Sequence, residues 1–277
     1  MPPVPPDWNE LNRHHWDERV PVHVRSTFYD VEGFVAGRPS LEPFEVDELG
    51  PLGDLRLAHL QCHLGLDTLD LVRLHPGLTA IGLDFSEPAV EEASALAARI
   101  GLSDRCSFVV GDVFAATRVL EPSSFDVIYT GKGAISWLND LDTWASQCFA
   151  LLRSGGFLYV SEFHPVGYVL STSSPTVADD YFRTDPWVDD EPGTYADPTA
   201  ATVHNTAVCW NHPLPSIFSA LLSAGFELRF FHEYDYTLFR LNDWLVEGED
   251  GRFRWPDAGA RLPLMFSLKA YRPAGRD

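Results

Sequence analysis

The sequence is poor in basic residues compared with acidic ones. It has 20 Lys and Arg and 40 Asp and Glu in 277 residues, which gives a formal net charge of −20. A chain with this excess of negative charge repels a polyanion, so nucleic acid is not expected as a partner. The charge suits an enzyme that acts on small neutral or cationic molecules, although acidity more often reflects solubility than substrate choice.

Cysteine is also scarce, and long apolar runs are missing. The four cysteines, Cys62, Cys106, Cys148 and Cys209, lie far apart, and no pair has the spacing of a zinc site. We therefore expect free thiols in a reducing cytoplasm, and a cytoplasmic protein. No charged segment leads into an apolar one as in a signal peptide, and no apolar run is long enough to cross a bilayer, so no membrane partner is expected.

Strand and helix patterns alternate between residues 57 and 162. The strand candidates are short, apolar and bounded by turn residues, and helical patterns lie between them. This alternation favours an α/β fold with a doubly wound, mostly parallel sheet that helices cover on both faces. The predicted strands are 57–62, 79–84, 106–110, 125–130, 156–162, 226–234 and 263–271, and the predicted helices are 66–74, 88–100, 141–152 and 214–224.

Two further segments flank or interrupt this pattern. Residues 1–50 are predicted to form an N-terminal helical cover, with a polar and aromatic helix over 7–19, and residues 51–277 form the main domain. Within that domain, residues 163–213 are rich in proline and acidic residues and predict an irregular insertion after strand five, with or without a short hairpin. Their aromatic residues favour a lid that packs on the domain and shapes a substrate pocket.

The most informative segment runs from Leu57 to Gly65. It predicts a buried strand followed by a turn, with a helix beginning at Leu66. Backbone N–H groups and the positive end of the helix dipole make such a junction a binding site. About twenty residues later, the second strand ends in Asp84, whose carboxylate can accept two hydrogen bonds from a ribose diol. The pair predicts a site for a nucleoside cofactor.

The order of these elements resembles the class I S-adenosylmethionine-dependent methyltransferases over roughly residues 57–271. Asp84 matches the family's ribose-binding acid, Phe85 the residue that stacks near adenine, and Gly111-Asp112-Val113 the turn that contacts adenine. The run Leu152-Arg153-Ser154-Gly155-Gly156 matches the turn before strand five. The resemblance implies a seven-stranded, Rossmann-like sheet with an antiparallel last strand, S-adenosylmethionine as cofactor and S-adenosylhomocysteine as product.

The first turn departs from the family pattern D-x-G-x-G-x-G. Here it reads His59-Leu60-Gln61-Cys62-His63-Leu64-Gly65, so only the last glycine is kept, and it is similar to an LQCH-x-G-x-D turn of a bacterial subgroup. One interpretation is that Gln61 or His63 hydrogen-bonds the cofactor's carboxylate. A second is that they only fill space and satisfy the loop backbone, and a third is that cofactor binding is weakened or lost.

We place four further residues around the cofactor. Gly65 lies at the methionine end, and Thr130 and Gly131, at the end of strand four, flank the methyl group. Trp16 either packs the N-terminal helix on the domain or forms an aromatic wall beside the sulfonium, where cation–π attraction suits the charge. Lys132 is expected to be solvated or paired with a carboxylate of the insertion rather than catalytic.

Two titratable residues lie at the end of strand five. Glu162 and His164 are two residues apart and can face the same side. His164 is a candidate general base, and Glu162 a candidate for holding a substrate amine; the alternative is that both only form structural hydrogen bonds. No metal is expected, because the adjacent His14 and His15 point about 100° apart on a helix and cannot chelate one ion together.

The sequence thus predicts a methyltransferase that acts on a small-molecule acceptor, as a monomer or homodimer. A nicotinamide-dependent dehydrogenase would need G-x-G-x-x-G, which is absent. Adenine-N6 DNA methyltransferases carry an N/D-P-P-Y/F run where this chain reads Tyr129-Thr130-Gly131-Lys132-Gly133. The competing hypothesis, motivated by the altered first turn, is a methyltransferase-like fold repurposed as a lyase or hydrolase, or as a non-catalytic partner subunit.

Overall fold

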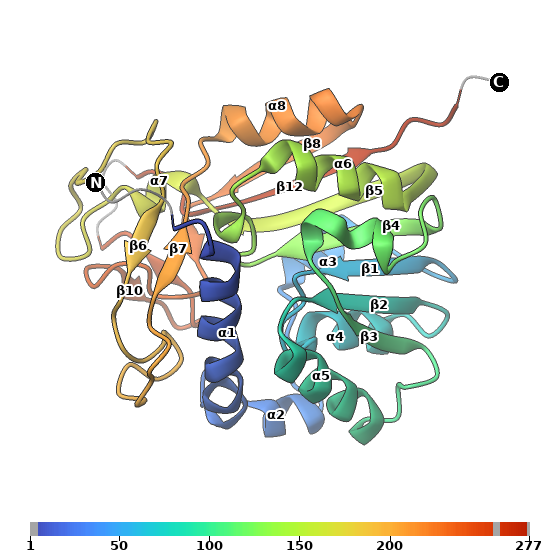
Figure 1. The fold of residues 1–277 in the computed structure, drawn as a ribbon, viewed down its shortest axis with the longest axis horizontal. Coiled ribbons are helices and arrows are strands. Elements are labelled where there is room, and N and C mark those ends of the chain that lie inside the picture. The colour runs from blue at the N-terminus through green and yellow to red at the C-terminus, as the bar shows by residue number, and fades with distance from the viewer. Residues whose placement is uncertain (1–4, 257–260, 276–277) are drawn as a thin grey trace.

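A mixed seven-stranded sheet forms the centre of the protein, as seen in a computed structural model that describes residues 5–256 and 261–275 (Figure 1). The strand order is β3-β2-β1-β4-β5-β12-β8, and β12 runs antiparallel to both of its neighbours while the other pairs are parallel. The predicted sheet is confirmed. Its strands are β1 Arg56–Leu60, β2 Thr79–Asp84, β3 Cys106–Val110, β4 Phe125–Gly131, β5 Leu152–Phe163, β8 Glu227–Tyr234 and β12 Met265–Tyr271.

Helices cover both faces of this sheet, because successive side chains of each strand point to opposite sides. Leu57 and Val127 belong to one apolar cluster, whereas their neighbours Ala58 and Ile128 belong to the other. The first cluster includes side chains of α2 to α5, and the second includes side chains of η1, α6 and α8. The bounds are α2 Val31–Val35, α3 Pro43–Leu49, α4 Leu66–Leu74, α5 Glu87–Arg99, η1 Val113–Arg118, α6 Leu141–Leu151 and α8 Leu214–Ala224.

The sequence located most of the regular elements to within a few residues, and the largest differences have local causes. The N-terminal helix, α1, runs from Trp8 to Arg25, well past its predicted end at 19, with Pro21 inside it. A second small sheet was not predicted, because its strands are too short to show an alternating pattern. Its members are β9 Tyr236–Thr237, β10 Val246–Glu247 and β11 Phe253–Arg254.

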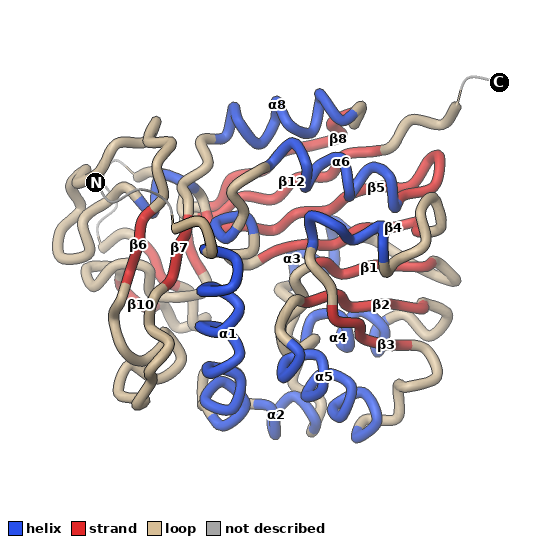
Figure 2. Tube along the Cα trace, in the orientation of Figure 1, coloured by secondary structure: helices blue, strands red, loops and turns tan. Residues whose placement is uncertain are grey.

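Residues 163–213 leave the sheet at the carboxyl end of β5. They contain the short helix α7 (Pro165–Tyr168) and an antiparallel pair, β6 (Trp187–Asp189) and β7 (Ala207–Cys209). The Asn12 side chain of α1 donates to the carbonyl of Val208 and accepts its N–H, both at 2.8 Å. Figure 2 shows α1 and this strand pair side by side at the carboxyl end of the sheet, so the two segments cover that edge together.

Two simple properties of the chain also follow from the described residues. Within 5–256 and 261–275, no helix combines the length and apolar character that a membrane span requires. The four cysteines are free, and Cys62, Cys106 and Cys148 are buried.

Candidate functional site

Asp84, the last residue of β2, lies at the carboxyl edge of the sheet under α1. The residue is 6 % exposed, and its carboxylate accepts the backbone N–H of His63 at 2.8 Å and of Ser86 at 3.0 Å. Burial raises the pKa of Asp84 to about 6, and the nearby Asp17 carboxylate raises it further. The hydrogen bonds from the backbone act in the opposite direction and lower this pKa. The two oxygens of a carboxylate offer about four acceptor sites, and these backbone bonds do not use all of them, so the group can still accept a hydroxyl donor.

The first turn is occupied by its own side chains. Gln61 and His63 have φ values of 59° and 48°, the left-handed region that glycine adopts without strain. The Gln61 Nε2 donates to the carbonyl of Ala134 at 2.9 Å and ties this turn to the loop after β4. The Gln61 Oε1 is buried and has no partner among the described residues. His63 Nε2 lies 2.8 Å from His23 Nδ1, so both side chains bind protein atoms in this structure.

Gly65 is required by packing as well as by conformation. It precedes α4 with φ of +70°, and a Cβ atom at this position would lie 2.5 Å from Cε1 of Phe108 and 3.0 Å from Cβ of Ala93. Such contacts are far shorter than van der Waals distance. Side chains of β3 and α5 therefore leave no room for a side chain at position 65, so packing alone requires glycine here, whatever ligand binds beside it.

An aromatic and histidine cluster connects α1, the first turn and the insertion. The Trp16 ring lies 5.2 Å from His63 and 5.1 Å from Trp137, measured between ring centroids. His23 Nε2 lies 2.7 Å from the hydroxyl of Thr194 in the insertion. Burial lowers the pKa of His63 to about 4 and is the largest cause of a pKa of about 2 for His23, so both rings are neutral near pH 7.

The turn after β3 is also joined to α1. Asp112 precedes η1 and accepts the N–H of Phe114 at 2.9 Å, while its other oxygen accepts from Asn9 Nδ2 at 3.1 Å. Val113 is buried beside it, and Phe85 is partly exposed after Asp84. Because β2 pairs with β3 up to Asp84, the expected ribose and adenine residues lie at neighbouring strand ends.

Sequence reasoning missed most of what α1 brings to this site. Asn9, Trp16 and His23 all contact the strand-end turns, through Asp112, His63 or Trp137. They are separated by seven residues each, which places them on one face of a helix. That spacing was the available signal, and only Trp16 was selected from it.

Two residues end β4: Thr130, which is buried, and Gly131, which is partly exposed. Thr130 is fully buried and its hydroxyl donates to the carbonyl of Leu60 at 3.1 Å. A Cβ at Gly131 would lie 2.5 Å from the carbonyl oxygen of Ser161. The expected partner of Lys132, a carboxylate of the insertion, is wrong: its Nζ lies 3.0 Å from carboxylates of both Glu45 in α3 and Asp67 in α4.

Glu162 and His164 are both almost fully buried at the end of β5. The Glu162 carboxylate accepts the backbone N–H of Gly133 at 2.6 Å, of Ile135 at 3.0 Å and of Phe163 at 2.7 Å, and burial raises its pKa to about 7. His164 Nδ1 accepts the N–H of Val166 at 3.1 Å, and its Nε2 lies 3.1 Å from Glu233. Burial lowers the pKa of His164 to about 4.

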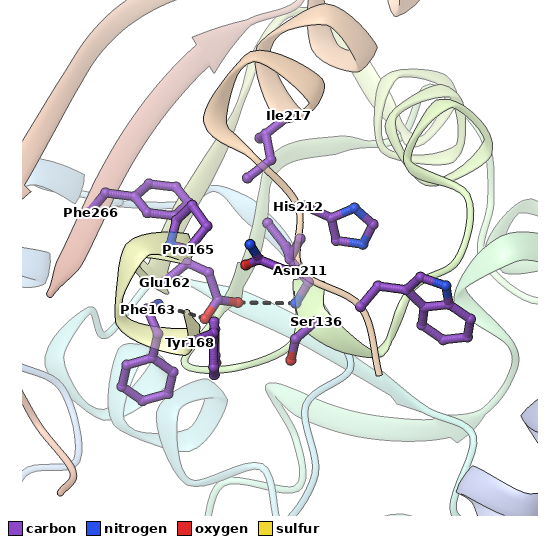
Figure 3. A pocket seen from close by; sticks show the side chains of 11 residues that line it. Ser136, Glu162, Phe163, Pro165, Tyr168, Asn211, His212, Ile217 and Phe266 are labelled. Carbon is purple, nitrogen blue, oxygen red and sulfur yellow. Dashed lines mark hydrogen bonds between the residues drawn. The ribbon is translucent and has the colours of Figure 1, made fainter. Parts of the chain in front are cut away.

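Beside Glu162 lies a small pocket between β5, the loop after β4, α7 and the segment before α8 (Figure 3). Asn211 and Tyr168 line it together with apolar residues. Across 5–256 and 261–275, no group of three or more His, Cys, Asp or Glu side chains is arranged to hold a metal ion.

Glu162 provides a pH-dependent prediction. The folded protein retains a proton on Glu162 that the unfolded chain releases between pH 4.5 and about 7. The stability that this group contributes is therefore fully present below pH 4.5 and is lost as pH rises through about 7. As the pH rises over this interval, the unfolding free energy of the wild type should fall by about 3 kcal/mol relative to that of Glu162→Gln. The variant also has a constant loss of stability at every pH, because its amide is misplaced among these N–H groups.

Urea unfolding at several pH values measures this difference. Glu121→Gln is the matched control, because the Glu121 side chain is 73 % exposed, and its stability relative to wild type should change little with pH. Parallel stability curves for wild type and Glu162→Gln would contradict the prediction.

Comparison with known proteins shows what the central part of the chain is similar to. Residues 58–158, which run from β1 into β5, match a family described as a methyltransferase domain. This match covers a little more than a third of the chain. Over 138 residues the chain is 26 % identical to the sterol 24-C-methyltransferase of Clavispora lusitaniae. The aligned region covers 50 % of this chain and 36 % of that protein. The match thus spans about a third of that curated relative.

Solved structures are similar in fold to nearly the whole chain. Geranyl diphosphate C-methyltransferase from Streptomyces coelicolor A3(2) is 14 % identical, with a TM-score of 0.60, and the match covers 98 % of this chain and 100 % of that one. The cyclase SpnF is 16 % identical, with a TM-score of 0.57 and 99 % of both chains covered. At these identities the likeness concerns the fold alone.

Proposed function

We propose that this chain transfers a methyl group from S-adenosylmethionine to a small-molecule acceptor. One observation carries the proposal: within the segment that matches a methyltransferase domain, Asp84 places a buried carboxylate with acceptor capacity to spare at the end of β2, at the carboxyl edge of the sheet. This is the position at which the α/β topology places a ribose.

The polar groups at this edge fit the cofactor. Asp17 Oδ1 and Gln61 Oε1 are buried with no partner among the described residues, and Asp84 retains free lone pairs. The ribose hydroxyls, the adenine amine and the methionine ammonium are all hydrogen-bond donors, so a donor-rich ligand complements these acceptors. We assign Asp84 to the ribose, Phe85, Asp112 and Val113 to adenine, Gln61, His63 and Gly65 to the methionine end, and Trp16, Thr130 and Gly131 to the surroundings of the methyl group.

When bound, the cofactor's sulfonium supplies a methyl group that is already activated for transfer. The protein must then hold the acceptor in line and keep water out, and orientation of this kind can contribute on the order of 7–11 kcal/mol. Trp16 packs against Trp137 above the first turn and so shields the edge from solvent. Gln61 fixes the first turn to the loop after β4 at Ala134, which sets the distance between cofactor and acceptor loops.

Isothermal calorimetry with S-adenosylmethionine and S-adenosylhomocysteine tests the proposal. We expect both to bind with dissociation constants well below roughly 1 mM, that is, with more than about 4 kcal/mol of binding free energy. Absorbance titration with NADH is the control and should show no binding. Mass spectrometry of the purified protein for a retained nucleoside is an independent measurement. Affinities weaker than roughly 1 mM for both ligands would contradict the proposal.

One observation favours a second candidate, in which the fold no longer transfers methyl groups. The side chains of Gln61 and His63 occupy the turn where the family has glycines, and the cyclase SpnF has the same fold. A lyase, a hydrolase or a non-catalytic partner subunit would follow if the calorimetry detects neither ligand. Size-exclusion chromatography would then show whether the chain is a monomer or a homodimer.

A further inference from the structure

Asp17, in the middle of α1, has a carboxylate of which only one oxygen is bound. Its Oδ2 accepts from Arg13 Nη1 at 3.0 Å, whereas its Oδ1 is buried and has no partner among the described residues. A buried polar atom without a hydrogen bond costs free energy, so this oxygen is suited to a donor that a bound ligand supplies. Arg13, which also pairs with Glu10, holds the Asp17 side chain in this orientation.

The position of Asp17 along α1 corresponds to the middle of the expected cofactor. The helix runs along the carboxyl ends of the strands (Figure 1). Asn9 binds Asp112 at the expected adenine end, and His23 contacts His63 at the expected methionine end. Asp17 lies eight residues after Asn9 and six before His23, which is ~12 Å and ~9 Å along the helix axis. Because the ribose joins adenine to the methionine part, it is the part expected beside Asp17.

The packing of α1 also directs Asp17 toward Asp84. Val20, one turn further along the same face of the helix, is buried in the apolar cluster that contains Ala89 and Val90 of α5. Helices α1 and α5 are in contact, and α5 follows β2 after a turn of two residues, so this face of α1 looks toward the end of β2. The charge of Asp17 is close enough to raise the pKa of Asp84.

Asp84 alone has too few free acceptor sites for both hydroxyls of a ribose. A carboxylate offers about four such sites, and the backbone N–H groups of His63, Ser86 and Phe85 use three of those on Asp84. The remaining site suits one hydroxyl donor. The other hydroxyl of the diol then needs a second acceptor, and Asp17 Oδ1 is a carboxylate oxygen at this edge that still lacks a donor.

We propose that two carboxylates hold the ribose, with Asp84 accepting its 2′-hydroxyl and Asp17 its 3′-hydroxyl. In dinucleotide-binding sheets the acid at the strand end binds the 2′-hydroxyl, which leaves the 3′-hydroxyl for α1. Oδ1 of Asp17 has no access to water with α1 in place, so the nucleoside binds when this helix lifts and closes over it. This inference rests on the proposed function, and it assigns a specificity-determining residue outside the segment that matches the methyltransferase domain.

Calorimetry of the full chain with adenosine, 2′-deoxyadenosine and 3′-deoxyadenosine tests this assignment. We expect the wild type to bind adenosine at least about tenfold more tightly than either deoxynucleoside, because each lacks one hydrogen bond to a carboxylate. Asp17→Ala should lose the preference over 3′-deoxyadenosine and keep the preference over 2′-deoxyadenosine. Glu10→Ala is the matched control, because Glu10 also pairs with Arg13 but is 61 % exposed, and it should keep both preferences.

S-adenosylhomocysteine, titrated alongside, separates this inference from the proposed function. Equal wild-type affinities for adenosine and 3′-deoxyadenosine would overturn the role of Asp17, and this result does not depend on the folding of any variant. A preference for the 3′-hydroxyl that survives in Asp17→Ala would overturn it as well. If S-adenosylhomocysteine binds in either of these cases, only the inference fails. The expected nucleoside pattern without S-adenosylhomocysteine binding keeps the two-carboxylate site and overturns methyl transfer, and no binding of any of these ligands overturns both.

Discussion

Replacing Lys132 with methionine is expected to lower the free energy of unfolding by about 3–5 kcal/mol, the usual cost of removing one partner from a buried ion pair. Lys132 Nζ lies 3.0 Å from carboxylates of both Glu45 and Asp67 and 3.2 Å from the carbonyl of Ser40. Glu45 is 0 % exposed, so its charge has no access to water once the lysine is gone.

The neighbouring groups cannot take over the role of this lysine. Glu45 already accepts the hydroxyl of Tyr129 at 2.7 Å and the N–H of Glu42 at 2.9 Å, and Asp67 accepts the hydroxyl of Ser40. Burial raises the pKa of Glu45, whereas attraction to Lys132 holds the pKa of Asp67 below its usual value in spite of burial. Without Lys132, two buried carboxylates repel each other, and at least one must take up a proton.

Urea denaturation at pH 7 measures the loss. Arg99→Met is the matched control, because it breaks an ion pair with Glu32 whose side chains are 47 % and 77 % exposed, and it should cost far less stability than Lys132→Met. The double variant Lys132→Met, Glu45→Gln should recover part of the stability by removing one stranded charge. A loss for Lys132→Met that is no larger than the control would show that the buried ion triad does not stabilise the fold.

The partners of Lys132 illustrate what the sequence could not provide. The apolar alternation of β1, β2 and β4 is local, and it correctly placed these strands in a parallel sheet. The contact between Lys132 and Glu45 instead joins positions far apart in the chain. Glu45 lies on α3, a seven-residue helix inside the predicted N-terminal helical cover whose bounds were not predicted. A charge–charge contact of this kind leaves no periodic signal, so an exposed or insertion-bound lysine was the natural expectation.

The candidate site also has one part that the sequence predicted and another that it did not. The end of a predicted strand was enough to place Asp84 at the sheet edge, because a parallel topology brings strand ends together. The hydrogen bond to Asp84 from the N–H of His63 was not predictable, because it depends on a positive φ at a residue where such values are uncommon. The contact of Thr194 with His23 depends on the path of an irregular insertion, which composition alone does not determine.

Substituting Asp84 with alanine is expected to weaken S-adenosylhomocysteine binding at least about tenfold, since a hydrogen bond to a charged group contributes about 1.5–3 kcal/mol. Calorimetry measures this loss. Asp104→Ala, at an exposed position before β3, is the control and should leave the affinity unchanged. The substitution also removes the acceptor for the N–H groups of His63 and Ser86, so a weaker affinity alone does not separate ribose binding from support of the first turn.

A comparison of adenosine with 2′-deoxyadenosine separates these two roles of Asp84. If the carboxylate binds the ribose diol, the wild-type protein binds adenosine more tightly than the deoxynucleoside, and the variant loses this preference because the acceptor of the 2′-hydroxyl is gone. If Asp84 only holds the turn, both nucleosides weaken equally and any preference survives. An equal loss would therefore show that Asp84 does not bind the ribose. The proposed methyl transfer would then lose the observation on which it depends.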